Sequence, residues 1–209
     1  MKHLLKSLDW SGTREQCAHA EVETARLRLR MFVAEDADEL SLITCDPEVM
    51  RYIATGLPIS REETIQNLNS IINGFNRRGF GRWAVTLKET GRLIGYCGLT
   101  LLDEAVGVEL VYLFGKAYWG KGIASEAARA SLRYAFGELQ LKRVVALTKP
   151  DNARSRRVLE GIGMRFQTYS HYYGYDCVCY EMNRAEFCPD IALYLPRRTR
   201  LKATALPKL

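Results

Sequence analysis

The feature that most constrains this chain is a glycine-rich turn between an expected strand and an expected helix. Gly107 to Phe114 (GVELVYLF) has the apolar character of a largely buried strand, and residues 122–137 have a helical pattern. Trp119-Gly-Lys-Gly-Ile-Ala-Ser125 lies between them and places two glycines where the helix begins. Free backbone N–H groups and the helix dipole favour an anion there, such as a pyrophosphate. The alternative is a turn that only connects the strand to the helix.

Two other phosphate-binding motifs share part of this pattern, and each lacks a residue that it needs. Gly115 to Lys121 has the spacing of a P-loop, but Gly122 stands where Ser or Thr must bind Mg²⁺. The dinucleotide-binding motif needs a third glycine, where this chain has Ser125, and an acidic residue about twenty positions later, where it has Lys142. The sequence therefore argues against both nucleotide folds.

A second helix start carries an unusual set of charges. Asn152-Ala-Arg-Ser155 has Asn152 in the N-cap position and Ser155 at N3. Arg154, Arg156 and Arg157 crowd the first turns, where cations oppose the helix dipole. This misfit favours a nearby anion, of which a phosphate is the simplest. A capped helix with solvated arginines is the alternative.

The remaining elements predict an α/β (α+β) fold around a mixed sheet. A capping box at Ser60 and Glu63 begins a long helix, and Glu89-Thr-Gly91 is typical of a hairpin turn. Consecutive strands together with crossover helices predict a mixed sheet of about seven strands flanked by about four helices. The expected helices span residues 35–44, 60–78, 122–137 and 152–161, and the expected strands span 24–32, 81–88, 92–102, 107–114 and 141–148, with two more inside 165–182.

Length and charge predict one domain with an extension at each end. With 209 residues and 47% apolar content, the chain can bury one substantial core but hardly two. We expect an N-terminal extension over 1–22, the domain over 23–187 and a basic C-terminal tail over 188–209. The tail holds five basic residues against Asp190, which accounts for most of the net charge of +6. It is either a solvated extension or a weak contact to RNA or the ribosome.

Membrane, secretion and metal signals are not expected in this chain. The sequence has no apolar run of roughly 18 residues, and charges interrupt its first residues before a signal peptide could form. We therefore expect a cytoplasmic protein without membrane contact. The six cysteines form no C-x-x-C motif and the three histidines are far apart, so we expect neither a metal site nor a disulfide framework.

Taken together, the two helix starts resemble the cofactor motifs of the GNAT acetyltransferase superfamily. The resemblance rests on Trp119-Gly-Lys-Gly-Ile-Ala124 and on Asn152-Ala-Arg-Ser155 followed by Arg157-Val-Leu-Glu-Gly-Ile-Gly-Met164. More narrowly, the chain resembles the ribosomal-protein N-terminal (alanine) acetyltransferase type over residues 23–187. That narrower likeness rests on Asp46-Pro-Glu-Val-Met-Arg-Tyr52, Val108-Glu-Leu-Val-Tyr112, Tyr118-Trp-Gly-Lys-Gly122 and Tyr180-Glu-Met-Asn-Arg.

The resemblance implies a single GNAT domain with a splayed central sheet and acetyl-CoA as the cosubstrate. It implies that Leu113 and Phe114 lie along the pantetheine arm and that Asn152 contacts that arm. Trp119 begins the loop, where the superfamily usually has Gln or Arg, which weakens one side-chain contact and leaves the backbone cradle. The residues implied to hold the pyrophosphate through their backbone amides are Gly120, Lys121, Gly122, Ile123, Ala124 and Ser125.

Glu109 and Ser155 are the candidate catalytic residues. Glu109 shares a strand face with Val111 and Leu113, and a carboxylate on an apolar face is either paired or raised in pKa, which suits a general base. A strand-end glutamate that reaches solvent or an arginine is an equal alternative. Ser155 is the candidate acid toward the leaving sulfur, because the resembled type has a serine in that role. Otherwise its hydroxyl only caps backbone groups.

The expected reaction is direct acetyl transfer to a primary amine, either a protein N-terminus or a small molecule. Tyr52, Trp83 and the aromatic run at residues 169–175 are candidates for lining the acceptor site, with core packing as the alternative. A non-catalytic acyl-CoA-binding or RNA-associated module on the same fold is the second functional hypothesis. A monomer and a homodimer are both open.

Overall fold

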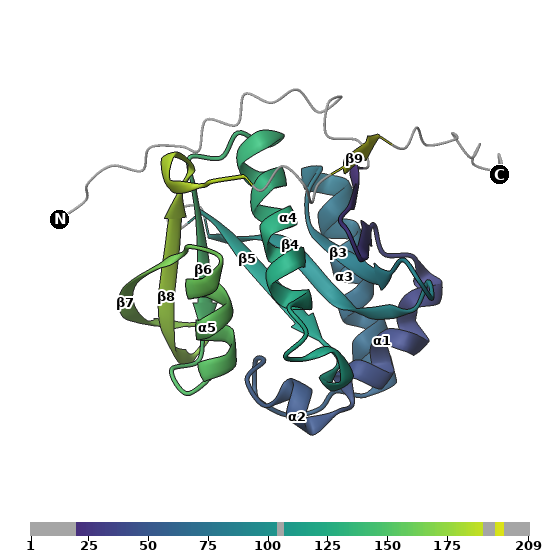
Figure 1. Cartoon of the computed structure of the whole chain (residues 1–209). Coiled ribbons are helices and arrows are strands. Elements are labelled where there is room, and N and C mark those ends of the chain that lie inside the picture. Colours follow the sequence, from purple (N-terminus) through teal and green to yellow (C-terminus); the bar gives the residue numbers. More distant parts are fainter. Residues whose placement is uncertain (1–19, 104–106, 190–194, 199–209) are drawn as a thin grey trace.

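A nine-stranded mixed sheet organises this protein, in the strand order β7-β8-β6-β5-β4-β3-β2-β1-β9. The computed structural model describes residues 20–103, 107–189 and 195–198 (Figure 1). Neighbouring strands in this part of the chain are antiparallel except β5 and β6, which are parallel. The strands are β1 (Ala20–Glu23), β2 (Leu27–Arg30), β3 (Arg82–Leu87), β4 (Leu93–Asp103), β5 (Gly107–Phe114), β6 (Arg143–Thr148), β7 (Arg165–Tyr172), β8 (Tyr175–Asn183) and β9 (Leu195–Arg198).

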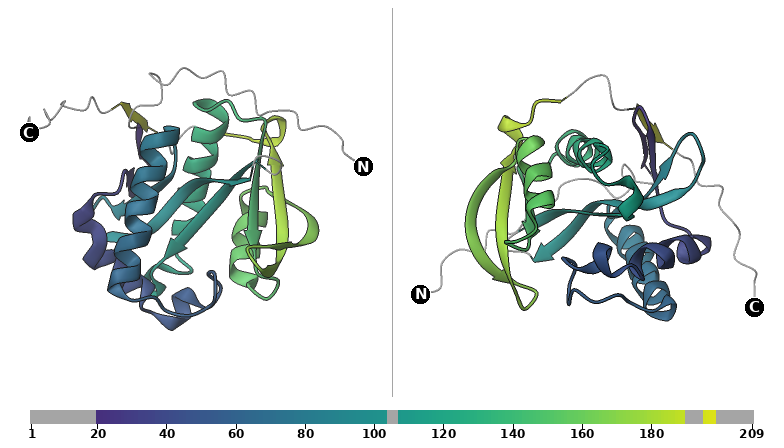
Figure 2. Two further views of the ribbon diagram at one scale, coloured as in Figure 1. Left: turned by 180° about the vertical axis from the view of Figure 1, so that it is seen from behind. Right: turned by 60° about the horizontal axis from the view of Figure 1, so that its bottom comes forward.

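Helices cover both faces of the sheet. Helices α4 and α5 lie on one face and α1 to α3 on the other, and the β7–β8 hairpin is strongly curved (Figure 2). Small residues of α4, such as Ala127, Ala128 and Ala135, are buried in the main core and let the helix approach the strands closely. The helices are α1 (Ala37–Thr44), α2 (Pro47–Met50), α3 (Arg61–Arg78), α4 (Ile123–Gly137) and α5 (Ala153–Gly161), with three short 3-10 turns at Ala34–Asp36, Lys116–Tyr118 and Arg184–Glu186.

The expected mixed α/β fold is confirmed, but the expected element numbers are wrong. The strand expected over 24–32 is the shorter strand β2, and β1 precedes it, mostly in residues that we assigned to the N-terminal extension. Between the two strands the chain reverses at Thr24, whose Oγ1 accepts a hydrogen bond from the Leu27 N–H at 3.0 Å. Asp46 follows helix α1 and begins a further helix that we did not predict. Its carboxylate accepts from the Glu48 N–H at 2.9 Å and caps the short helix α2, with Pro47 at its first position.

The ninth strand comes from the segment that we expected to be a basic C-terminal tail. Leu195–Arg198 pairs antiparallel with β1 through its backbone, so these four residues belong to the sheet, which the sequence did not predict. The sequence did not predict this strand, because a short basic segment that contains proline has no alternation of apolar and polar residues. The rest of the expected tail beyond Pro189 and the expected extension before Ala20 lie outside the described residues.

The two parallel strands diverge, and this opening positions the site. In the described structure β5 and β6 are paired at one position only, Glu109 opposite Val145. On its other side β6 pairs with β8 from Arg143 to Thr148, so it stays in the sheet while it moves away from β5. The splayed sheet that the family resemblance implies is therefore present, with Glu109 at the point where the strands separate.

Candidate active site

The glycine loop leaves the start of α4 open to a ligand. Gly120 and Gly122 have φ values of +72° and +73°, in the left-handed region that glycine adopts without strain. Gly122 is the N-cap of α4 and has no side chain to accept from the N–H groups of the first turn. A Cβ atom on Gly120 would meet no described atom within 4 Å. The exposed N–H groups and the helix dipole therefore fit a phosphate group, and binding of the pyrophosphate by this loop stays a prediction.

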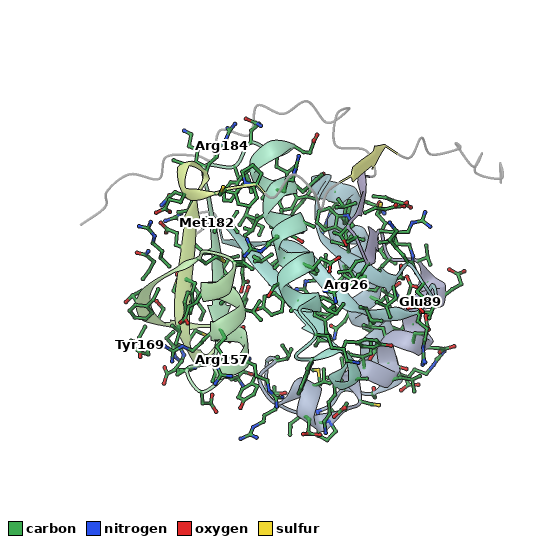
Figure 3. All side chains as sticks on the ribbon, in the orientation of Figure 1. Arg26, Glu89, Arg157, Tyr169, Met182 and Arg184 are labelled. Carbon is green, nitrogen blue, oxygen red and sulfur yellow. The ribbon has the colours of Figure 1, made fainter. Side chains whose placement is uncertain are left out.

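A network around Glu126 ties this loop to the turn between β1 and β2. Glu126 lies in the first turn of α4 and accepts from Thr24 Oγ1 at 2.5 Å, from the Arg26 N–H at 3.0 Å and from Arg26 Nε at 2.7 Å. Arg26 also donates to the Lys121 carbonyl at 2.9 Å, and it lies beside α4 in Figure 3. Burial acts to raise the pKa of Glu126, but the bonds from Thr24 and Arg26 outweigh it and keep the pKa low. The carboxylate is thus ionised, and Arg26 offsets its repulsion of a second anion at this helix end.

We expect Arg26→Met to raise the KM for acetyl-CoA about 10-fold, because hydrogen bonds to charged groups contribute roughly 1.5–3 kcal/mol and the loop loses its anchor. S-acetylpantetheine lacks the pyrophosphate, so its KM should stay within twofold in the variant. Steady-state kinetics with both donors measures the difference. Arg28→Met is the matched control, because it removes a comparable pair with Glu21 (2.6 Å) that does not touch the loop. Equal losses with both donors would contradict a role in the phosphate site.

Glu109 is buried at the point where β5 and β6 separate. Its side chain is 5% exposed, and its Oε2 accepts a hydrogen bond from the Tyr173 hydroxyl at 3.2 Å. Burial raises its pKa to about 7, against the lowering effects of the Tyr173 bond, the Arg82 charge and the Leu147 N–H. Burial contradicts the alternative of a glutamate that reaches solvent. None of the ion pairs among the described residues includes Glu109, so it is not paired with an arginine there. Its part in proton transfer stays a prediction.

Ser155 lies at N3 of α5, and its hydroxyl contacts a tyrosine rather than capping the helix. Asn152 is the N-cap and its Oδ1 accepts from the Ser155 N–H at 3.1 Å, as predicted. The Ser155 Oγ lies 2.8 Å from the Tyr112 hydroxyl. Burial raises the pKa of Tyr112, so the phenol keeps its proton at neutral pH. When Tyr112 donates to Oγ, the serine proton is left to point toward a ligand.

The sequence did not indicate Tyr112, although alternation along β5 contains the signal. Glu109, Val111 and Leu113 face one side of the sheet, so Tyr112 faces the other side with α5. The carboxylate and the Tyr112–Ser155 pair therefore lie on opposite faces of one strand beside the β5–β6 opening. Such an arrangement can take a proton from a group on one face and donate a hydrogen bond on the other.

The remaining predicted cofactor residues link the two motifs. The Trp119 indole N–H donates to the Phe114 carbonyl at 2.8 Å, and the Arg154 guanidinium lies 4.8 Å from the Trp119 ring centre. Leu113 and Phe114 are each 4% exposed and pack in different core clusters. Their side chains are thus engaged in packing, and what they offer to a ligand is their main chain.

The structure places the aromatic residues proposed for the acceptor site in different environments. Trp83 is fully buried and packs edge-on against Tyr134 of α4, so the interpretation as a lining residue is wrong and core packing is correct. Tyr169 is exposed and packs on Phe166. From the hairpin turn, Tyr173 reaches Glu109, and of these residues it is the one that the structure joins to the site.

A helix start that fits an anion, at the end of a splayed strand with a buried carboxylate at the separation, is the arrangement expected of an α/β transferase that takes a phosphate-containing donor. In the described ranges no three His, Cys, Asp or Glu side chains gather as metal ligands would. None of the described helices has the length and apolar character needed to cross a bilayer.

Comparisons with known proteins agree with this class. Residues 26–165 match the family model described as Acetyltransferase (GNAT) domain, so the chain belongs to the GNAT acetyltransferase family, whose members use acetyl-CoA as cosubstrate. It is 35% identical over 144 residues to p20 of Bacillus licheniformis, named as an N-acetyltransferase, covering 68% of this chain and 80% of that protein.

Solved structures show the same fold. A GNAT-family acetyltransferase from Bacillus anthracis superposes with a TM-score of 0.70 at 30% identity, covering 79% of this chain and 99% of that one. A ribosomal-protein alanine acetyltransferase from Vibrio fischeri has a TM-score of 0.66 at 17% identity, covering 81% of this chain and 99% of that one, and shares the fold alone. The family resemblance is thus confirmed.

Proposed function

We propose that this protein transfers an acetyl group from acetyl-CoA to a primary amine by direct attack, with Glu109 as the general base and Ser155 as the hydrogen-bond donor to the leaving sulfur. The observation that carries the proposal is the buried Glu109 at the single β5–β6 pairing, next to an anion-binding helix start. A protein N-terminus and a small-molecule amine are the two acceptor classes.

The donor site follows from the loop and from the free edge of β5. The N–H groups of residues 120–125 bind the pyrophosphate, and the β5 main chain beyond Glu109, including Leu113 and Phe114, faces the opening left by β6. A thioester arm that runs through this opening brings its carbonyl carbon between the two faces of the sheet. Asn152 lies at the start of α5 on the Ser155 side, beside Arg154 and Trp119.

The chemistry requires two protons to leave the ammonium nitrogen, one before it attacks and one as the amide forms, and the second proton neutralises the departing thiolate. Glu109 accepts the first proton from the ammonium, directly or through water, and the neutral nitrogen attacks the thioester carbonyl. As the C–N bond forms and the C–S bond breaks, Ser155 donates to the developing thiolate, while Tyr112 keeps the serine proton oriented. A pKa near 7 suits Glu109 to an α-amine of pKa about 7.7–8.0 better than to a lysine of about 10.4.

A thiol-release screen tests the proposal. The protein is mixed with acetyl-CoA and separate panels of N-terminal peptides, polyamines, aminoglycosides and amino acids, and free CoA is measured by a thiol reagent with mass detection of the product. We expect acetylation of at least one primary amine. CoA binding without acetylation of any panel member would instead support the non-catalytic acyl-CoA-binding module.

A further inference from the structure

The guanidinium group of Arg82 lies on the same face of the sheet as Glu109, and it forms no ion pair with an acid among the described residues. Arg82 begins β3, is partly buried, and places its guanidinium 5.6 Å from the centre of the Tyr96 ring. The ion pairs among residues 20–103, 107–189 and 195–198 link other arginines to acids, such as Arg30 to Asp36 at 2.7 Å. Arg82 has the Tyr96 side chain as a hydrogen-bond partner, but a neutral phenol does not offset its charge.

The strand registers put Arg82, Tyr96 and Glu109 around one patch of the sheet. Arg82 is opposite Gly98, and Gly98 is opposite Val111, two residues along β5 from Glu109. Residues that lie opposite one another share a face, and so do residues two apart. Tyr96 lies on this face in the next row, opposite Leu113. Gly98 carries no side chain, so β4 places nothing between Arg82 and the Glu109 strand in that row.

The position of Arg82 is unfavourable for a base that receives a proton from an ammonium group. Its positive charge lowers the pKa of Glu109 and repels the incoming ammonium. Burial raises the pKa of Tyr96, so its phenol keeps a proton that it can donate. A substrate carboxylate would offset both effects of Arg82, because it would pair with the guanidinium and leave the amine beside Glu109.

We propose that the acceptor is a primary amine that carries a carboxylate close to its nitrogen, as in an amino acid, and that Arg82 binds this carboxylate with a second hydrogen bond from Tyr96. This inference rests on the proposed function of the same site. It assigns Arg82 as the residue that determines acceptor class. Polyamines and aminoglycosides, which carry several positive charges, are poor acceptors on this assignment.

The test compares amines that differ in the carboxylate, with kcat/KM expressed per concentration of neutral amine because the carboxylate also raises the pKa of the amine. The protein is assayed with acetyl-CoA and pairs of an amino acid and its amide, for example methionine with methioninamide and tryptophan with tryptophanamide. We expect kcat/KM for the acid to exceed that for the amide by about 10- to 100-fold, the range for a charge-assisted hydrogen-bond pair. In Arg82→Gln the acid-to-amide ratio should fall toward one. The control Arg92→Gln, an exposed arginine beyond the β3–β4 turn, should keep the wild-type ratio.

The outcomes separate this inference from the proposed function. A ratio near or below one in the wild-type protein, or a ratio that Arg82→Gln leaves unchanged, would overturn the assignment of Arg82 while acetyl transfer stands. Efficient acetylation of polyamines together with none of the amino acids would also overturn it. Absence of acetyl transfer to any amine would refute the proposed function itself.

Discussion

Glu109→Gln should lower kcat by about 10²–10⁴, the range for loss of a general base, with little change in the affinity for CoA. The amide keeps the size and a hydrogen-bond acceptor for Tyr173, but it cannot take a proton from the ammonium. Because the side chain lies on the sheet face away from Ser155 and does not belong to the glycine loop, CoA binding should survive. Steady-state kinetics with an identified acceptor and calorimetry with CoA measure the two effects.

The pH dependence gives a second readout of the same residue. Glu109 works when it is ionised, and its pKa is raised to about 7, so kcat/KM in the wild-type protein should rise with pH through about 7 and again as the amine loses its proton. The variant should keep only the ionisation of the amine. Glu181→Gln is the matched control, since Glu181 lies on β8 opposite Val145, as Glu109 does on β5, but pairs with Arg143 at 3.2 Å. A Glu109→Gln protein with the wild-type rate between pH 6 and 9 would show that the carboxylate is only structural.

Gly122→Val should raise the Kd for CoA at least about 100-fold while the fold persists. Gly122 has a φ of +73°, which costs an L-residue about 1–2 kcal/mol and a β-branched residue more. The loop relieves that strain by moving, and two misplaced N–H donors to a charged phosphate are each worth roughly 1.5–3 kcal/mol. Isothermal calorimetry with CoA, together with circular dichroism, checks both parts of the prediction.

Gly91→Val is the control for backbone strain. Gly91 has a φ of +70° in the turn between β3 and β4, and a Cβ there meets no described atom within 4 Å. Both variants should lower the melting temperature by a similar amount, but only Gly122→Val should weaken CoA binding. If both bind CoA as the wild type does, the loop does not hold the pyrophosphate.

Short-range features of the fold could be predicted from the sequence. The capping box at Ser60 and Glu63, the N-cap at Asn152 and the glycines at the start of α4 all lie where the sequence predicted them. These signals work because a cap or a left-handed turn is decided within three or four residues. Alternation along one strand also assigned the face of Glu109, but it left open whether the side chain is buried or reaches solvent.

Contacts between segments that are distant in the sequence could not be predicted from it. The network of Thr24 and Arg26 with Glu126 spans about a hundred positions, and Tyr112 reaches Ser155 across 43. From the sequence, Tyr173 could not be distinguished from the other tyrosines of residues 169–175 as an active-site residue. In the structure the curved β7–β8 hairpin places its hydroxyl within hydrogen-bond distance of Glu109. Each of these side chains has ordinary neighbours in sequence, so no local pattern distinguishes it.

By itself, the sequence determined the mixed α/β fold, the glycine-rich helix start, the capped helix at Asn152 and the candidate residues Glu109 and Ser155. Only the tertiary structure decided that the described sheet has nine strands, that β5 and β6 separate at Glu109, that Tyr112 contacts Ser155, and that Tyr173 and the charge of Arg82 act on Glu109. The physical reason is the number of residues over which each feature is decided. Periodicity, caps and glycine turns depend on backbone geometry over a few residues, whereas strand register and contacts across a sheet depend on how the whole core packs.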